Sequence, residues 1–482
     1  MAARAATAYG APMEPSQAVA PDLFDAIADP TVLLPLVMAN AMSPRLWRMG
    51  RRMAASADPL EHARRLVDTS FTHMQPERMA ELDGYIDLDA ERRRLGADVV
   101  DGAIADIDAG WDARRKRGLL HPEDSLQEVM TAGRFPAYAY ANVDVINAAR
   151  RAPGGPGQRP RGLTSCLDEA ALFGALLMLT PEVTGRLDGI ALLASSLHYT
   201  VFGWTGEGAW WFWSKRDLFT QEAFASRTAT AHGGDPGDAI DAVMAAPIRR
   251  VVSRRGSLDT HAGTCSLPAD ELRRTLAAVE GFFGVLPPGL DVPVDGLRFT
   301  PPSPHDALFA RAVECMSAED VQRVVRDAHA ADGPEAGAAG EALLAFRSLE
   351  VADLMPYLQA ARRSPGLRLA AGRALGGMEP RSPEDALKIA AGPAAGPALG
   401  DSSRLALPHE ALARGSCSPA ERGLLLHVLL EQVGEAPVRT VIMDGDAITR
   451  MGDLAVRSSD GSRVDPAAVG TDGPALAHAT GA

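Results

Sequence analysis

Short apolar segments in the middle of the chain predict a β-sheet, and apolar residues at helical spacing predict helices on both sides of it. The segments DGIALLASS, LHYTVFGW and AWWFW, within residues 188–213, are rich in aliphatic and aromatic residues and predict three strands. CLDEAALFGALLML predicts an apolar helix that begins at or near Cys166, with Thr164 and Ser165 available as caps. A further helix is expected over 268–284.

The connection between the second and third segments sets the expected strand register. It reads TGEG, and a glycine at the first of its two central positions favours a tight hairpin turn. Such a turn pairs Trp204 with Ala209 and brings His198 opposite Lys215. Asp217 is then the diagonal neighbour of His198 on the same face, whereas a turn longer or shorter by one residue moves the carboxylate to the other face.

Periodicity and composition divide the rest of the chain into predicted units. TVLLPLVMANAM, from Thr31, is too short and too interrupted by Pro35 to cross a membrane, so it predicts a buried or docking helix. VRTVIMDGDAITRMGDLAV predicts a small hairpin. We expect a flexible lead at 1–21, a helical subdomain at 22–125, an α/β core at 126–302, a helical domain at 303–435, and a small hairpin with a disordered tail at 436–482.

Composition and charge narrow the class of protein. Of the 482 residues, 46% are hydrophobic and 23% are charged, as in ordinary globular proteins. The net charge of −14 argues against nucleic-acid and membrane partners, because those surfaces attract basic proteins. The start of the chain lacks a secretory signal pattern, and the four cysteines include no CxxC pair, which together favour a cytoplasmic protein. Nearly all the positive charge is arginine, which suggests a GC-rich bacterial genome.

Cys166 is the first candidate for chemistry. A helix N-terminus favours the thiolate through its partial positive charge and its free backbone N–H groups, and the same amides can hold an oxyanion. A cysteine nucleophile also needs a base and a third group that orients the base. His198 and Asp217 follow Cys166 in the chain and supply both residue types.

The order of these residues resembles a known family. TSCLDEA, LHYTVFGW and WWFWSKRDLFT, within residues 161–220, are similar to motifs of the transglutaminase-like branch of the papain-type cysteine enzymes. The resemblance implies an α+β fold in which an N-terminal cysteine helix packs on an antiparallel sheet, with mostly helical N- and C-terminal additions. It also implies that Cys166 attacks an amide or ester carbonyl, that His198 transfers the proton, and that Asp217 orients His198.

Each of these residue types also has a purely structural explanation. A cysteine such as Cys166 at the head of an apolar helix is usually a small buried hydrophobe. Trp204, Trp211 and Trp213 could form a substrate-binding aromatic wall, although aromatic residues on both faces of a sheet more simply pack against helices. Cys265 is a rival nucleophile, but no histidine strand and aspartate strand follow it.

Other polar residues give weaker signals. His232 and His261 lie in glycine-containing loops without further ligands at suitable spacing, so we expect no metal and no cofactor. Tyr138, Tyr140 and Asn142 are upstream candidates for a second oxyanion donor.

The sequence therefore predicts cysteine-dependent acyl transfer or amide hydrolysis through a thioester. The expected partners are a small-molecule or peptide acyl donor and an amine or water acceptor. The alternative is a non-catalytic interaction or scaffold protein with a degenerate core, which binds a protein partner through its helical surfaces. The arginine-rich segment RRVVSRR, at 249–255, is interpreted as a solvated face.

Overall fold

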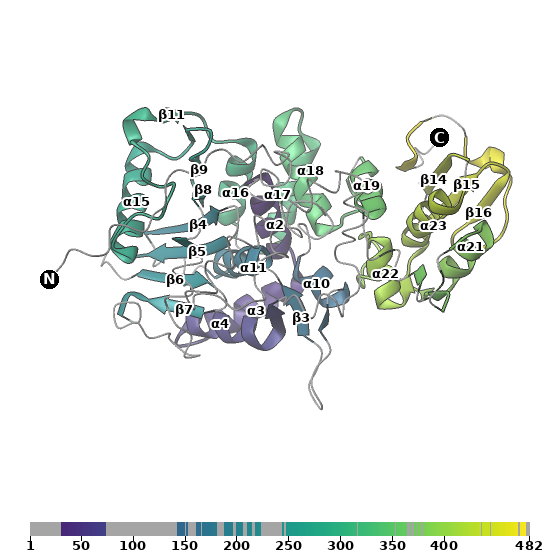
Figure 1. The fold of residues 1–482 in the computed structure, drawn as a ribbon, viewed down its shortest axis with the longest axis horizontal. Coiled ribbons are helices and arrows are strands. Elements are labelled where there is room, and N and C mark those ends of the chain that lie inside the picture. Colours follow the sequence, from purple (N-terminus) through teal and green to yellow (C-terminus); the bar gives the residue numbers. More distant parts are fainter. Residues whose placement is uncertain are drawn as a thin grey trace, which may run out of the picture.

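The computed structural model describes a mixed α+β protein, which confirms the α+β part of the predicted fold class. Figure 1 shows the larger sheet in the left half of the molecule and a smaller C-terminal sheet at the right. The expected flexible lead and the predicted helical segment from 74 to 125 lie outside the described residues. The described residues are 30–73, 142–149, 151–152, 161–164, 166–180, 188–195, 199–205, 210–214, 217–222, 243–244, 247–315, 317–351, 353–363, 367, 371–372, 374–376, 378, 380–434, 436–443, 445–470 and 473–478.

An eight-stranded sheet organises the central part of the described chain, with the strand order β11-β10-β9-β8-β4-β5-β6-β7. All neighbouring strands are antiparallel except β10 and β11. The strands are β4 Gly189–Ser195, β5 Tyr199–Trp204, β6 Trp210–Ser214, β7 Asp217–Thr220, β8 Ile248–Ser253, β9 Gly256–Asp259, β10 Thr264–Cys265 and β11 Arg298–Phe299. The three strands predicted from the apolar segments are confirmed as β4, β5 and β6.

The connection between β5 and β6 is longer than predicted. Trp204 pairs with Trp210 rather than with Ala209, so residues 205–209 link the two strands. The predicted register is therefore wrong by one residue, because a single glycine at the first central position did not determine the length of the turn.

The position of Asp217 also differs from the prediction. β6 ends at Ser214, and the chain reverses so that Asp217 pairs with Ser214 as the first residue of β7. β6 thus lies between Asp217 and the strand that follows His198. Asp217 is therefore not the diagonal neighbour of His198 on one hairpin, because Asp217 belongs to β7 and not to the strand that pairs with β5.

Two helices cover opposite faces of the sheet. They are α11, Cys166–Met178, and α15, Ala269–Phe283, both close to their predicted positions. Because side chains alternate along a strand, Trp213 faces α11 whereas Phe212 faces α15. Phe173 of α11 stacks on Trp213 with ring centroids 4.3 Å apart, and Phe282 of α15 packs on Phe212 with centroids 5.8 Å apart.

The N-terminal helices pack into the same core as α11. α2 is buried over most of its length and contacts both α11 and α18, Pro334–Phe346, so the predicted buried helix at 31–42 is confirmed. Pro35 lies inside it. The elements of this region are α2 Pro30–Ala41, α3 Pro44–Ala54, α4 Pro59–Ser70, β1 Phe71–His73, α10 Val143–Ala149, β2 Arg151–Ala152 and β3 Arg161–Thr164.

The described residues between 303 and 435 are mainly helical. Besides α18 they contain α16 Pro304–Val313, α17 Ala318–Ala330, α19 Met355–Arg363, α21 Pro383–Ala391, α22 Pro408–Arg414 and α23 Pro419–Val433, with the short strands β12 Ala394–Ala395 and β13 Ser416–Cys417. Within the described part of the chain, no helix combines the length and the apolar character needed to cross a membrane.

The C-terminal region forms a four-stranded sheet with the order β16-β15-β14-β17. Its strands are β14 Val438–Met443, β15 Asp446–Met451, β16 Leu454–Arg457 and β17 Leu476–His478. The predicted hairpin is confirmed as β14 and β15. The predicted disordered tail is corrected, because β17 pairs in parallel with β14 and Leu476 is buried.

A buried polar network joins α23 to this sheet. His427 is fully buried, and its ring nitrogens lie 2.9 Å from the Thr440 hydroxyl and 3.2 Å from Glu431 Oε1. Glu431 also accepts hydrogen bonds from Arg362 of α19. Burial alone would raise the pKa of Glu431, but the hydrogen bonds and charges of Arg362 and His427 lower it to about 2.

Gly203→Ala is expected to destabilise the protein by about 1–3 kcal/mol, because overpacking strains a core and the added Cβ would overlap the Trp211 indole. As a control, Gly337→Ala in α18 meets no atom within 4 Å and should be neutral or stabilising by up to about 1 kcal/mol. Urea unfolding measures both variants. Equal stabilities for the two would contradict the close approach of Trp211 to β5.

Glu431→Gln is expected to lower stability at pH 7, and the difference from the wild type should shrink as the pH falls. The lowered pKa of Glu431 means that its stabilisation is complete above its ordinary pKa of 4.5 and is lost as the pH falls toward about 2. Urea unfolding at pH 7, 4 and 3 measures the difference. Glu280→Gln, an exposed carboxylate on α15, is the control, and a pH-independent difference for Glu431→Gln would contradict the account.

Candidate active site

Cys166 is the first residue of α11, as the sequence predicts. Its side chain is only 5% exposed and belongs to the large apolar cluster between the helices and the sheet. Thr164, the last residue of β3, donates a hydrogen bond of 2.8 Å from its hydroxyl to Glu169 Oε1 in the first turn of α11. This bond fixes the start of the helix and thereby the position of the thiol.

The direction of α11 places Cys166 at one end of the sheet. Met178, the last residue of the helix, borders a small cavity together with Gly189, the first residue of β4. Midway along the helix, Phe173 stacks on Trp213. The 13 residues of α11 and the seven residues of β4 each span roughly 20 Å, so Cys166 lies toward the end of the sheet where β4 ends.

Two strand connections occur at this end of the sheet. β4 ends at Ser195 and β5 begins at Tyr199, so His198 directly precedes β5 in the chain; His198 itself lies outside the described residues. β6 ends at Ser214 and β7 begins at Asp217, whose side chain also lies outside the description. Because β6 separates β5 from β7, the backbones of these two strands lie about 10 Å apart.

Two carboxylates lie in the first turn of α11. Asp168 and Glu169 are 1% and 2% exposed, and their place in the motif CLDEAA gave a signal that the sequence interpretation did not use. Negative charge near a helix N-terminus is favourable for the helix, but it opposes a thiolate at Cys166. A reactive thiolate at this position therefore needs a nearby cation.

The three tryptophans proposed to bind substrate lie in two different environments. Trp211 and Trp213 are buried on the α11 side of the sheet, where both pack against Phe173. Trp204 packs in the other apolar cluster and borders a groove at the opposite end of the sheet from Cys166. Packing between helices and sheet accounts for the burial of Trp211 and Trp213.

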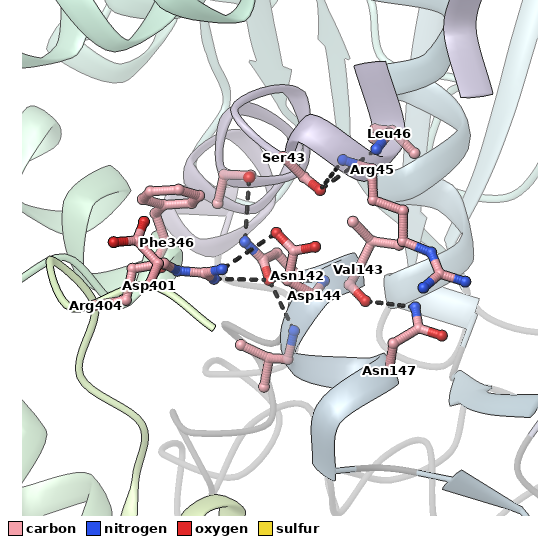
Figure 2. Close-up of polar contacts among 12 residues, drawn as sticks. Ser43, Arg45, Leu46, Asn142, Val143, Asp144, Asn147, Phe346, Asp401 and Arg404 are labelled. Carbon is pink, nitrogen blue, oxygen red and sulfur yellow. Dashed lines mark hydrogen bonds and ion pairs between the residues drawn. The ribbon is translucent and has the colours of Figure 1, made fainter. Parts of the chain in front are cut away.

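Asn142 is held by structural contacts. Figure 2 shows its side chain between α2, the start of α10 and Arg404. Its Nδ2 donates to Ala39 O at 3.3 Å, and its Oδ1 accepts from the Val145 backbone N–H at 3.1 Å. Arg404, stacked over Phe346, donates to Asn142 Oδ1 and pairs with Asp144. The other two oxyanion candidates, Tyr138 and Tyr140, lie outside the described residues.

The remaining thiols are in environments that suppress reactivity. Cys265 is fully buried, and burial raises the pKa of its thiol. Burial, together with the nearby Glu421, raises the pKa of Cys417 to about 12. Cys315 is partly exposed, and burial also raises its pKa. Cys265 is therefore a poor rival nucleophile, because only the thiolate attacks carbonyl carbon.

The described residues contain no group of three or more His, Cys, Asp or Glu side chains that could hold a metal ion. His261 lies exposed in the turn after β9, and His232 falls outside the described part of the chain.

Comparisons with known proteins assign no family or function to this chain. No protein-family model, no curated protein and no solved structure matches this chain. The candidate site is therefore interpreted from its own residues.

Asn142→Ala is expected to lower stability by about 1–3 kcal/mol, because it removes the cap of α10 and leaves buried donors without their acceptor. The alkylation rate of Cys166 in the folded protein should not change. Urea unfolding and iodoacetamide labelling measure the two effects. Asn147→Ala, which removes one bond within α10, is the milder control; an Asn142→Ala protein of wild-type stability would contradict the structural role.

Proposed function

We propose that the protein is a cysteine-dependent enzyme that transfers or hydrolyses an acyl group through a thioester on Cys166, as transglutaminase-like enzymes do. The observation that carries the proposal is the placement of Cys166 at the start of α11, at the end of the sheet where β5 and β7 begin. His198 directly precedes β5, and Asp217 is the first residue of β7. The acyl donor is a small molecule or a peptide.

The proposed reaction has two halves. The Cys166 thiolate attacks the carbonyl carbon, and the backbone N–H groups at the start of α11 hold the oxyanion. The C–S bond forms, the bond to the leaving amine or alcohol breaks, and the His198 imidazolium protonates the leaving group. An amine or water then attacks the thioester, gives its proton to His198, and releases the acyl product and the thiolate. Asp217 orients His198 and stabilises its cation.

The carboxylates in the first turn of α11 give His198 an electrostatic role in this proposal. The buried Asp168 and Glu169 lie close to Cys166 in the chain, and negative charge there acts against a thiolate. An imidazolium beside the sulfur would favour the thiolate of Cys166 over the thiol, because an opposite charge within a few ångströms lowers the pKa of a thiol.

The second candidate is a scaffold protein with a non-catalytic core of this fold. The burial of Cys166 favours it, and neither of the two cavities described above is bordered by Cys166. In that case the thiol is a packing residue, and a protein partner would bind the helical surfaces.

Cysteine alkylation separates these two functions. We expect iodoacetamide to modify Cys166 of the enzyme nearly as fast at pH 6 as at pH 9, because a thiolate–imidazolium pair persists below the ordinary pKa of cysteine. His198→Ala should slow the reaction at pH 6 by about tenfold or more and have less effect at pH 9. Peptide mapping by mass spectrometry measures the rate at each cysteine.

Cys265 and Cys417 are the internal controls, since burial protects them until the protein unfolds. A Cys166 that is as inert as these two thiols at both pH values would reject the enzyme and support the scaffold. A reactive Cys166 whose pH dependence is unchanged by His198→Ala would reject the assignment of the base.

A further inference from the structure

A groove of about 740 Å³ opens at the end of the large sheet opposite to Cys166. It is bordered by Asp188 just before β4, by Trp204 at the end of β5, and by Trp210 at the start of β6. The turn between β8 and β9 and the exposed side of α15 complete it. Figure 1 shows α15 beside this end of the strands, away from α11.

Two indole rings form rigid walls of the groove. Trp204 lies directly over Gly189, where any side chain would overlap its ring, and it stacks on Phe202 with centroids 5.6 Å apart. Trp210 lies against Gly281 of α15, only 3.3 Å from where a Cβ would be, which is closer than ordinary van der Waals contact. Glycines beneath both rings allow the close contact that holds them. Trp204 is only 8% exposed, so the partly exposed Trp210 offers the preformed flat apolar surface to a ligand.

Among the described charged residues of the groove, one guanidinium has no partner. Arg255 pairs with Glu271 at 3.4 Å, and Arg274 pairs with Asp270 at 3.2 Å. Arg254 borders the same groove and is partly buried, yet it makes no ion pair or hydrogen bond with any described residue. A partly buried cation is stabilised by a counter-charge, so the Arg254 guanidinium favours binding of an anion in the groove.

We propose that this groove binds a small aromatic monoanion, with its carboxylate on the Arg254 guanidinium and its ring against the Trp210 indole. Guanidinium groups bind carboxylates through paired hydrogen bonds, and aromatic rings pack favourably on indole. The volume is within the range of small-molecule sites. The described groove-lining side chains include three guanidinium groups and the carboxylates of Asp188 and Glu271, a net charge of about +1 that a single carboxylate would balance.

This site does not depend on the proposed function, because it lies at the other end of the sheet from Cys166. The sequence interpretation treated residues 249–255 as a solvated face, since nothing local indicates that the β8–β9 turn approaches α15.

Isothermal titration of the full chain with 2-naphthoate tests the proposal. We expect saturable binding, and we expect 2-naphthamide, the neutral analogue, to bind about tenfold more weakly or worse, because it lacks the charge-assisted bond. Arg254→Gln should weaken 2-naphthoate binding by about the same factor and leave 2-naphthamide binding unchanged. Arg273→Gln, an exposed arginine of α15 that does not border the groove, is the matched control and should bind within about twofold of the wild type.

Several outcomes would contradict the proposed binding site. Absence of 2-naphthoate binding at millimolar concentration, or equal binding of the acid and the amide by the wild type, would reject it without any variant. Unchanged 2-naphthoate binding by folded Arg254→Gln would reject the role of Arg254. Tighter binding of ADP than of 2-naphthoate would reject the monoanion preference and indicate a phosphate site instead.

Discussion

The packing of α11 on the aromatic face of the large sheet is the interaction on which the rest of the site depends. Phe173 stacks on Trp213 and meets Trp211 edge to face, so the helix is fixed both along the strands and around its axis. With Met178 beside the start of β4, the N-terminus of α11 can only lie at the other end of the sheet. That constraint, rather than any single polar contact, places Cys166 near the start of β5 and β7.

The same packing sets a conflict between burial and reactivity. The thiol lies among apolar side chains with two buried carboxylates in the same first turn of the helix, and both features favour the neutral form. The backbone amides of the helix act in the opposite direction. Catalysis at Cys166 therefore requires a cation and an entry path for substrate, whereas a packing role requires neither.

How far the sequence predicts the structure depends on whether the information is local. The start of α11 and the strands β4, β5 and β6 were predictable, because apolar periodicity and turn residues are properties of neighbouring positions. The register at Trp204 was not, because a loop of one more residue satisfies the same turn signal. The pairing of β17 with β14 and the position of Arg254 beside α15 depend on distant segments, which no local pattern reveals. Cys166 was found as a candidate, but its burial could not be predicted from its helix alone.

The most direct test of the central claim is a crystal structure in which the distance from Cys166 Sγ to the His198 ring is measured. The account predicts a ring nitrogen within about 4 Å of the sulfur, with Asp217 hydrogen-bonded to the other nitrogen, since a working nucleophile and base lie within or near hydrogen-bond reach. An imidazole more than about 7 Å from the sulfur, or on the α15 face of the sheet, would contradict the account. No single rotamer change could then bring the ring within hydrogen-bond reach of the sulfur for proton transfer.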